Sequence, residues 1–157
     1  MALVAVVSFL LGWGIYEGYW ATFPLVLPYG THPDSPWKID FIIVNQSRVL
    51  GMQNLQVTCY LDSVEYSNYV TVQGFALSHG VSREQQASLG PGEKGIYQCP
   101  DWLHVTEGTP VKAHILIGTS YMTWFVPRNP TLTSFTLRHT DAGYEWIEGA
   151  ELYSSED

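Results

Sequence analysis

The chain has 157 residues, 46% of them hydrophobic and only 14% charged, with a formal net charge of −8. This length suits one folded domain, and 6 Trp, 10 Tyr and 6 Phe residues can supply its core. Nucleic-acid binding needs clustered Lys and Arg, whereas the chain has 7 basic residues against 15 acidic ones. We therefore expect no nucleic-acid partner.

The N-terminal segment is almost wholly apolar, and Glu17 is the one charge among its first twenty residues. A helix over residues 2–20 would be about 28 Å long, close to the hydrocarbon thickness of a bilayer. A secretory signal peptide usually begins with Lys or Arg and ends in a small-x-small cleavage site; here no basic residue precedes Lys38, and residues 19–23 fit such a site poorly. The segment predicts a retained transmembrane helix over residues 1–22, with a cleaved signal peptide as the alternative.

Two patterns on this helix indicate its surroundings. Aromatic residues gather at its C-terminal end, as in a membrane-interface belt, and we expect Glu17 among them to reach headgroups or water. Small residues at helical spacing allow close packing against other membrane helices, although such spacings also arise by chance. The interface residues are Trp13, Tyr16, Tyr19 and Trp20, and the small ones are Ala5, Ser8, Gly12, Gly14 and Gly18.

The rest of the chain has the pattern of a mainly β domain. Residues 23–38 contain four prolines, which predict an extended connector. Beyond them come short runs rich in β-branched and aromatic residues, separated by turn-forming residues with no long amphipathic helix. The runs are residues 39–45, 55–61, 69–77, 94–99, 111–121 and 134–139.

This order predicts an antiparallel β-sandwich of six to seven strands over residues 39–147, with a closed barrel as the lesser alternative. Residues 148–157 form an acidic tail. Cys59 alternates with apolar neighbours and Cys99 follows a second strand pattern, so both side chains are expected to point inward. The pair predicts a disulfide between the sheets, and two buried free thiols are the alternative.

A family resemblance rests on three segments: Ile39–Asn45, Leu55–Cys59, and the Leu-Gly-Pro-Gly-Glu turn at residues 89–93 shortly before Cys99. Their order resembles immunoglobulin-like β-sandwiches of small, uncharacterised bacterial envelope proteins with one N-terminal helix. The resemblance covers residues 35–146 and implies the fold alone. The chain lacks the inward Trp between two Cys that antibody-type domains possess.

The sequence contains no pattern that selects a catalytic or metal site. The five His residues show no metal-ligand spacing, and neither Cys belongs to a CxxC pair. Glycine-rich phosphate loops, GxSxG elbows and HExxH helices are also missing. We therefore expect no enzymatic activity and no cofactor, and no small-molecule ligand is indicated.

Aromatic residues are dense near two predicted strand ends. If exposed, they would be anchors for a protein partner or for a membrane surface, and the alternative is that they fill the core. They are Tyr121, Trp124, Phe125, Tyr144 and Trp146.

These features together predict a single-pass protein of the inner or cytoplasmic membrane, with its folded domain on the periplasmic or extracellular side. Its expected partners are the lipid bilayer and other integral membrane subunits. The favoured function is a structural or accessory subunit that stabilises a larger complex of photosynthetic, respiratory or secretion type. The alternative is a tethered module that binds a peptide, glycan or small molecule.

Overall fold

The computed structural model describes residues 2–29, 37, 39–66, 71–79, 81–82, 88–99, 110–140 and 143–149. The chain begins with the α-helix α1 (Ala2–Ile15), which continues directly into a π-helical turn, η1 (Tyr16–Trp20). Apolar residues without proline allow this run, and the helix stops four residues before Pro24. Among the described residues, no helix has the length and apolarity needed to cross a membrane.

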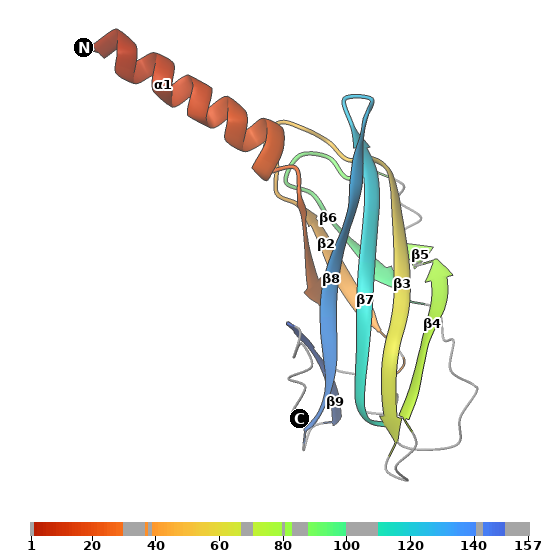
Figure 1. Cartoon of the computed structure of the whole chain (residues 1–157). Helices are drawn as coiled ribbons and strands as arrows, with labels where there is room; N and C mark the ends of the chain where they lie inside the picture. The colour runs from red at the N-terminus through yellow and green to blue at the C-terminus, as the bar shows by residue number, and fades with distance from the viewer. Residues whose placement is uncertain are drawn as a thin grey trace.

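Nine described strands form two antiparallel sheets, which we call sheet A and sheet B (Figure 1). Sheet A has the order β1-β2-β6-β5, and sheet B has the order β4-β3-β7-β8-β9. The strands of sheet A are β1 (Pro24–Pro28), β2 (Asp40–Asn45), β5 (Val81–Ser82) and β6 (Lys94–Gln98). Those of sheet B are β3 (Gln53–Tyr66), β4 (Thr71–His79), β7 (Pro110–Thr123), β8 (Val126–Thr140) and β9 (Gly143–Glu148). A mainly β fold is confirmed, and each of the six predicted runs overlaps one strand.

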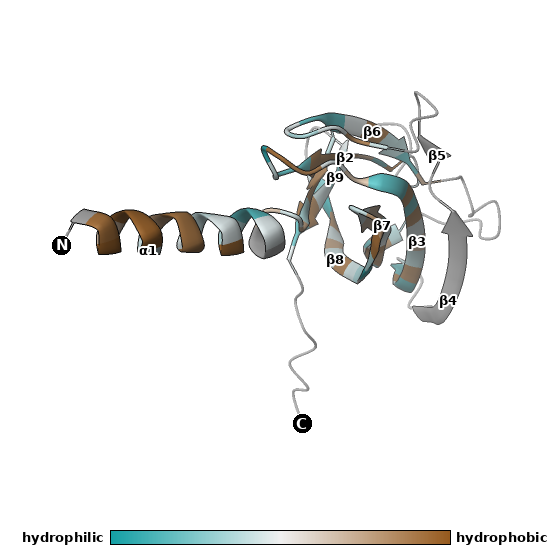
Figure 2. Ribbon diagram, turned by 90° about the horizontal axis from the view of Figure 1, so that it is seen from above, coloured by the Kyte–Doolittle hydropathy of each residue, from teal (hydrophilic) through white to brown (hydrophobic). Residues whose placement is uncertain are grey.

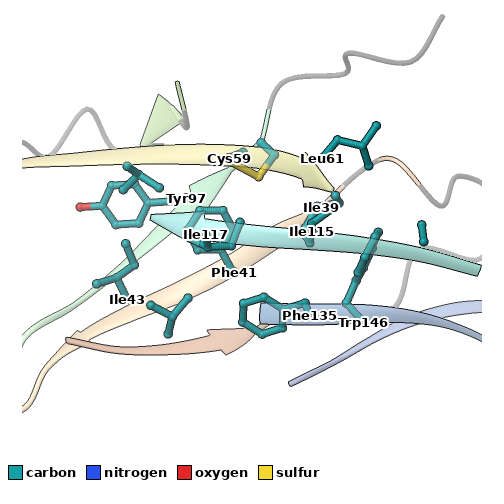
Figure 3. Close-up of a cluster of buried hydrophobic side chains, with 14 of the residues drawn as sticks. Ile39, Phe41, Ile43, Cys59, Leu61, Tyr97, Ile115, Ile117, Phe135 and Trp146 are labelled. Atoms are coloured by element: carbon teal, nitrogen blue, oxygen red, sulfur yellow. A yellow bond between two sulfur atoms is a disulfide. The ribbon is translucent and has the colours of Figure 1, made fainter. Parts of the chain in front are cut away.

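The two sheets share one hydrophobic core, and together we call them the body (Figure 3). Along β3 the residues alternate between buried and more exposed, with Leu55, Val57 and Cys59 facing inward. This alternation follows from the two-residue period of a strand. Sheet A contributes Phe41 and Tyr97, whose rings stack with centroids 6.1 Å apart.

The predicted disulfide is present. The sulfur atoms of Cys59 and Cys99 are 2.07 Å apart, and both residues are fully buried. Cys59 lies in β3 of sheet B, and Cys99 directly follows β6 of sheet A. The bond therefore links the two layers through the core, where Figure 3 places it.

The structure differs from the predicted connector at residues 23–38. Its first part is extended, as expected, but it is strand β1, which pairs with β2 from Pro24 opposite Asn45 to Pro28 opposite Phe41. Proline lacks an N–H group and is tolerated on an edge strand, which is the position of β1. Val26 between the two prolines is 2% exposed and belongs to the core. Only the turn at residues 21–23 separates η1 from the body.

The boundary between the body and the predicted acidic tail also differs from the prediction. Glu148, the first residue of the predicted acidic tail, is the last residue of β9. Strand β9 itself pairs with β8 along its whole length and is an edge strand of sheet B. Residues 150–157 lie outside the described part of the chain.

Candidate functional site: the helix-bearing end of the body

Helix α1 projects away from the body (Figures 1 and 2), and much of it is hydrophobic (Figure 2). Its large apolar side chains are exposed. Leu3 is 78% exposed, Phe9 67% and Leu11 63%. Burial of one such side chain is favourable by roughly 1.5–3 kcal/mol, so this surface is costly in water. An apolar surface of this extent usually marks an interaction site.

The small residues predicted to pack against other helices lie open along this segment. Ala5, Ser8, Gly12 and Gly14 are exposed on α1, and Gly18 is exposed on η1. A Cβ atom added at any of the three glycines would meet no heavy atom within 4 Å. The positions therefore leave room for a close neighbour, whose presence stays a prediction.

The predicted interface aromatics lie near the helix end. Trp13 is 43% exposed and Tyr16 50% exposed. The Trp13 ring stacks on that of Phe9 with centroids 6.3 Å apart, as an i, i+4 pair on a helix allows. The side chains of Tyr19 and Trp20 lie outside the described part of the chain.

Glu17 does not reach headgroups or water, contrary to the sequence prediction. It is 6% exposed, and its carboxylate accepts hydrogen bonds from the Ser47 hydroxyl at 2.9 Å and the Arg48 backbone N–H at 3.1 Å. The π-helical turn lies at the contact between helix and body, where it brings Glu17 to the loop after β2. Such turns are frequent at functional sites. Glu17 is thus a docking residue that fixes residues 16–22, which we call the helix base, to the loop after β2.

The loop that receives Glu17 is held by Asn45. The Asn45 side-chain oxygen accepts a bond from the Ser47 N–H, and its amide group donates to the carbonyls of Leu50, Leu89 and Gly90. Asn45 is 1% exposed, so its side chain is part of the interior. Ser47 in turn accepts a bond from the Leu50 N–H at 2.9 Å. These contacts fix the Ser47 hydroxyl in the position from which it donates to Glu17.

Sheet B contributes a second set of contacts to the helix base. The Tyr121 hydroxyl, near the end of β7, donates to the Thr22 carbonyl, and Arg128 of β8 donates from Nη2 to the Gly18 carbonyl at 2.8 Å. Burial raises the pKa of the Tyr121 phenol above its usual value of 10.0, while the charge of Arg128 and a hydrogen bond with the Thr22 side chain lower the pKa by smaller amounts. Helix and body are therefore joined through both sheets.

The β7–β8 hairpin ends in Trp124 and Phe125, which we call the hairpin tip. These side chains are 73% and 83% exposed. Their φ angles are +47° and +64°, and Thr123 pairs with Val126 across the turn. Two residues with positive φ between paired strands form the geometry of a type I′ hairpin turn, which favours Asn-Gly. Figure 1 places this turn at the end of the body from which α1 emerges.

The other aromatic residues predicted as surface anchors lie elsewhere. Tyr121 is 3% exposed and Trp146 is 7% exposed, and both belong to the core. Their side chains are therefore not surface anchors, because the strand period turns them inward. Tyr144 is partly buried against the same core. Trp124 and Phe125 are the two of the five whose side chains are largely exposed.

One shallow depression lies on sheet B, away from the helix base. Its lining includes Glu65, Lys112, Arg138 and Glu148, together with apolar parts of β8 and β9. Within the described residues no three His, Cys, Asp or Glu side chains gather in a way that could hold a metal ion. His32 and His104 lie outside those residues.

Comparison with known proteins identifies no relative: no protein-family model, no curated protein and no solved structure matches this chain.

Proposed function

We propose that the chain is a non-catalytic accessory subunit, held at a membrane by α1 and carrying its body on the periplasmic or extracellular side. One observation carries the proposal: α1 exposes apolar side chains along its length, while η1, which continues it, is hydrogen-bonded to the loop after β2 and to β8. A tether that needed only to hold a mobile domain would not require this rigid joint. A rigid joint suits a body that must keep one orientation within an assembly.

Lipid and neighbouring helices are the environments that suit α1. Its exposed large side chains are those of Leu, Val, Ile, Phe and Trp, and it carries no charge between Ala2 and Tyr16. Between helices in lipid, small residues allow close backbone approach. The open face of Ala5, Ser8 and Gly12 is therefore the surface on which we place a neighbouring subunit's helix.

The body is proposed to be an immunoglobulin-like sandwich. The order β1-β2-β6-β5 corresponds to strands A-B-E-D, and β4-β3-β7-β8 corresponds to C′-C-F-G, with β9 added at the edge. The disulfide joins the equivalents of strands C and E, whereas antibody domains join B and F. This architecture commonly provides contact surfaces, and a disulfide suits an oxidising compartment outside the cytoplasm.

Photo-crosslinking from α1 in native membranes tests the proposal. A photoreactive amino acid is placed at Ser8, on the small-residue face, or at Val6, two positions away. Because successive helical residues differ by about 100°, these side chains point in nearly opposite directions. We expect Ser8 to crosslink another polypeptide and Val6 to crosslink lipid.

Crosslinks to lipid from both positions would contradict the role as a subunit. The depression containing Lys112 and Arg138 would then be the candidate site of the alternative function, a tethered module that binds a peptide, glycan or small molecule. Substitution of both residues by Gln should abolish ligand retention in that case, while leaving any crosslink from Ser8 unchanged.

A further inference from the structure

The hairpin tip has no role in the packing of the body. Trp124 and Phe125 are the most exposed aromatic side chains among the described residues outside α1. The residues before the tip, Tyr121 and Thr123, point into the interior. Since the tip residues contribute so little to the core, their apolar character must have another cause.

The backbone conformation at the tip is also unfavourable for these two residues. Bulky side chains are unfavourable at positive φ, by roughly 1–2 kcal/mol for each residue in the left-handed region. Gly or Asn would form the same turn without this cost. Strained conformations of this kind concentrate at functional sites, where the side chain itself is required.

The tip is fixed in position relative to α1. Arg128, in the strand that leaves the tip, bonds to Gly18 at the helix end, and Tyr121, in the strand that leads to it, bonds to Thr22. Both apolar features lie at one end of the body (Figure 1). A bilayer that contains α1 would therefore lie next to the tip.

The charge distribution of the hairpin favours lipid as the occupant. Residues 113–140 contain no Asp or Glu, although the chain has 15 acidic residues in total. Arg128, three residues beyond Phe125, adds a positive charge on this hairpin. Trp is enriched at membrane interfaces because its ring is apolar and its N–H group is polar.

We infer that the hairpin tip inserts into the interfacial layer of the bilayer that holds α1, so that the body has two membrane contacts. This inference rests on the proposed membrane location of α1. Two contacts at one end fix the tilt of the body relative to the membrane, which a single helix would leave free. Strands β7 and β8 then stand away from the membrane, and the far end of sheet B faces solvent.

Fluorescence quenching by spin-labelled lipid tests the inference on the full chain. The protein is reconstituted in vesicles of phosphatidylcholine and phosphatidylglycerol that carry a nitroxide at a shallow or a deep acyl position. The signal of Trp124 is the difference between the native chain and Trp124→Phe, which keeps an apolar ring at the tip. The signal of Trp13 is obtained in the same way from Trp13→Phe and reports on α1.

A matched control is available on the same hairpin. Val111 is 53% exposed at the start of β7, roughly 40 Å from the tip along the strand. Val111→Trp therefore introduces an exposed Trp at the opposite end of the body. We expect strong quenching of Trp124 by the shallow nitroxide, weaker quenching by the deep one, and none of the Trp introduced at position 111.

The outcomes separate this inference from the proposed function. If Trp13 is quenched and Trp124 is not, the inference is overturned while the membrane anchor stands. If neither is quenched, both fail. Equal quenching at Trp124 and at the introduced Trp would indicate a body lying flat on the lipid, which also overturns the inference.

Discussion

Glu17 and Ser47 join the N-terminal helix to the body: the Ser47 hydroxyl donates a hydrogen bond of 2.9 Å to a carboxylate that lies 30 residues earlier in the chain. The same carboxylate accepts the Arg48 N–H. The one acidic residue in an apolar segment is therefore a structural element of the joint. Removal of this carboxylate should therefore weaken the contact between the helix base and the body.

Glu17→Ala is expected to lower the free energy of unfolding by about 1–3 kcal/mol, because it leaves buried donors without an acceptor. Hydrogen exchange at the Arg48 amide should accelerate in this variant. Glu17→Gln keeps an acceptor oxygen and should have a smaller effect on both measurements. Glu145→Ala, at an exposed position on β9, is the surface control. Unchanged Arg48 exchange in Glu17→Ala would contradict the docking role.

Tyr121→Phe removes the hydroxyl that bonds to Thr22 and should cost about 1 kcal/mol of stability near neutral pH. The pKa of Tyr121 is raised in the folded protein, so above about pH 10 the unfolded chain loses this proton first. Stability must then fall as pH rises through the range between the two pKa values. Tyr121→Phe should lessen this alkaline loss, whereas Tyr29→Phe, at a 43% exposed side chain, should not. Denaturant titrations between pH 8 and 11 measure the difference.

Reduction of the Cys59–Cys99 disulfide should destabilise the fold by about 4 kcal/mol, since the bond closes a loop of 40 residues in the unfolded chain. Denaturation with and without reductant gives this value. A Cys59→Ala/Cys99→Ala variant should match the reduced protein and should not respond to reductant. Alkylation of both thiols in the unreduced, unfolded chain would show that no bond forms.

Replacement of the hairpin tip by Trp124→Asn/Phe125→Gly should stabilise the isolated fold by about 2 kcal/mol, because Asn-Gly adopts the type I′ turn without strain. The midpoint of chemical denaturation in detergent measures the change. Leu132→Asn removes an exposed apolar side chain of β8 outside the turn and should leave the midpoint nearly unchanged. A lower midpoint for the tip variant would mean that the aromatic pair stabilises the body.

Asn45→Asp should destabilise the loop that receives the helix by about 3 kcal/mol, because a carboxylate would face three carbonyl oxygens that now accept from the amide. Asn54→Asp, at an exposed position, serves as the matched control. Thermal unfolding of the two variants distinguishes a buried hydrogen-bond centre from a general effect of added charge.

Local patterns in the sequence were sufficient to predict much of the fold. The alternation around Cys59 identified both a strand and its inward face, and the spacing to Cys99 indicated a bond between the sheets. Strand β1 was missed because its prolines resemble those of a linker, and proline is compatible with strands only at an edge that the sequence does not reveal.

The site itself was harder to predict because its contacts join distant segments. No local signal links Glu17 to Ser47, so a charge near the end of an apolar helix resembled an interfacial residue. The tip contains neither Gly nor Asn and so lacks the usual turn signal. Without the position of that turn, the exposed pair of Trp124 and Phe125 could not be separated from the buried Tyr121.

Alkaline extraction of native membranes tests the central claim most directly, since it removes peripheral proteins while leaving chains with membrane-embedded helices in the pellet. We expect the native chain to stay with the membrane and to be released by mild detergent together with other polypeptides. Recovery of the intact chain in the alkaline supernatant would contradict a membrane role for α1.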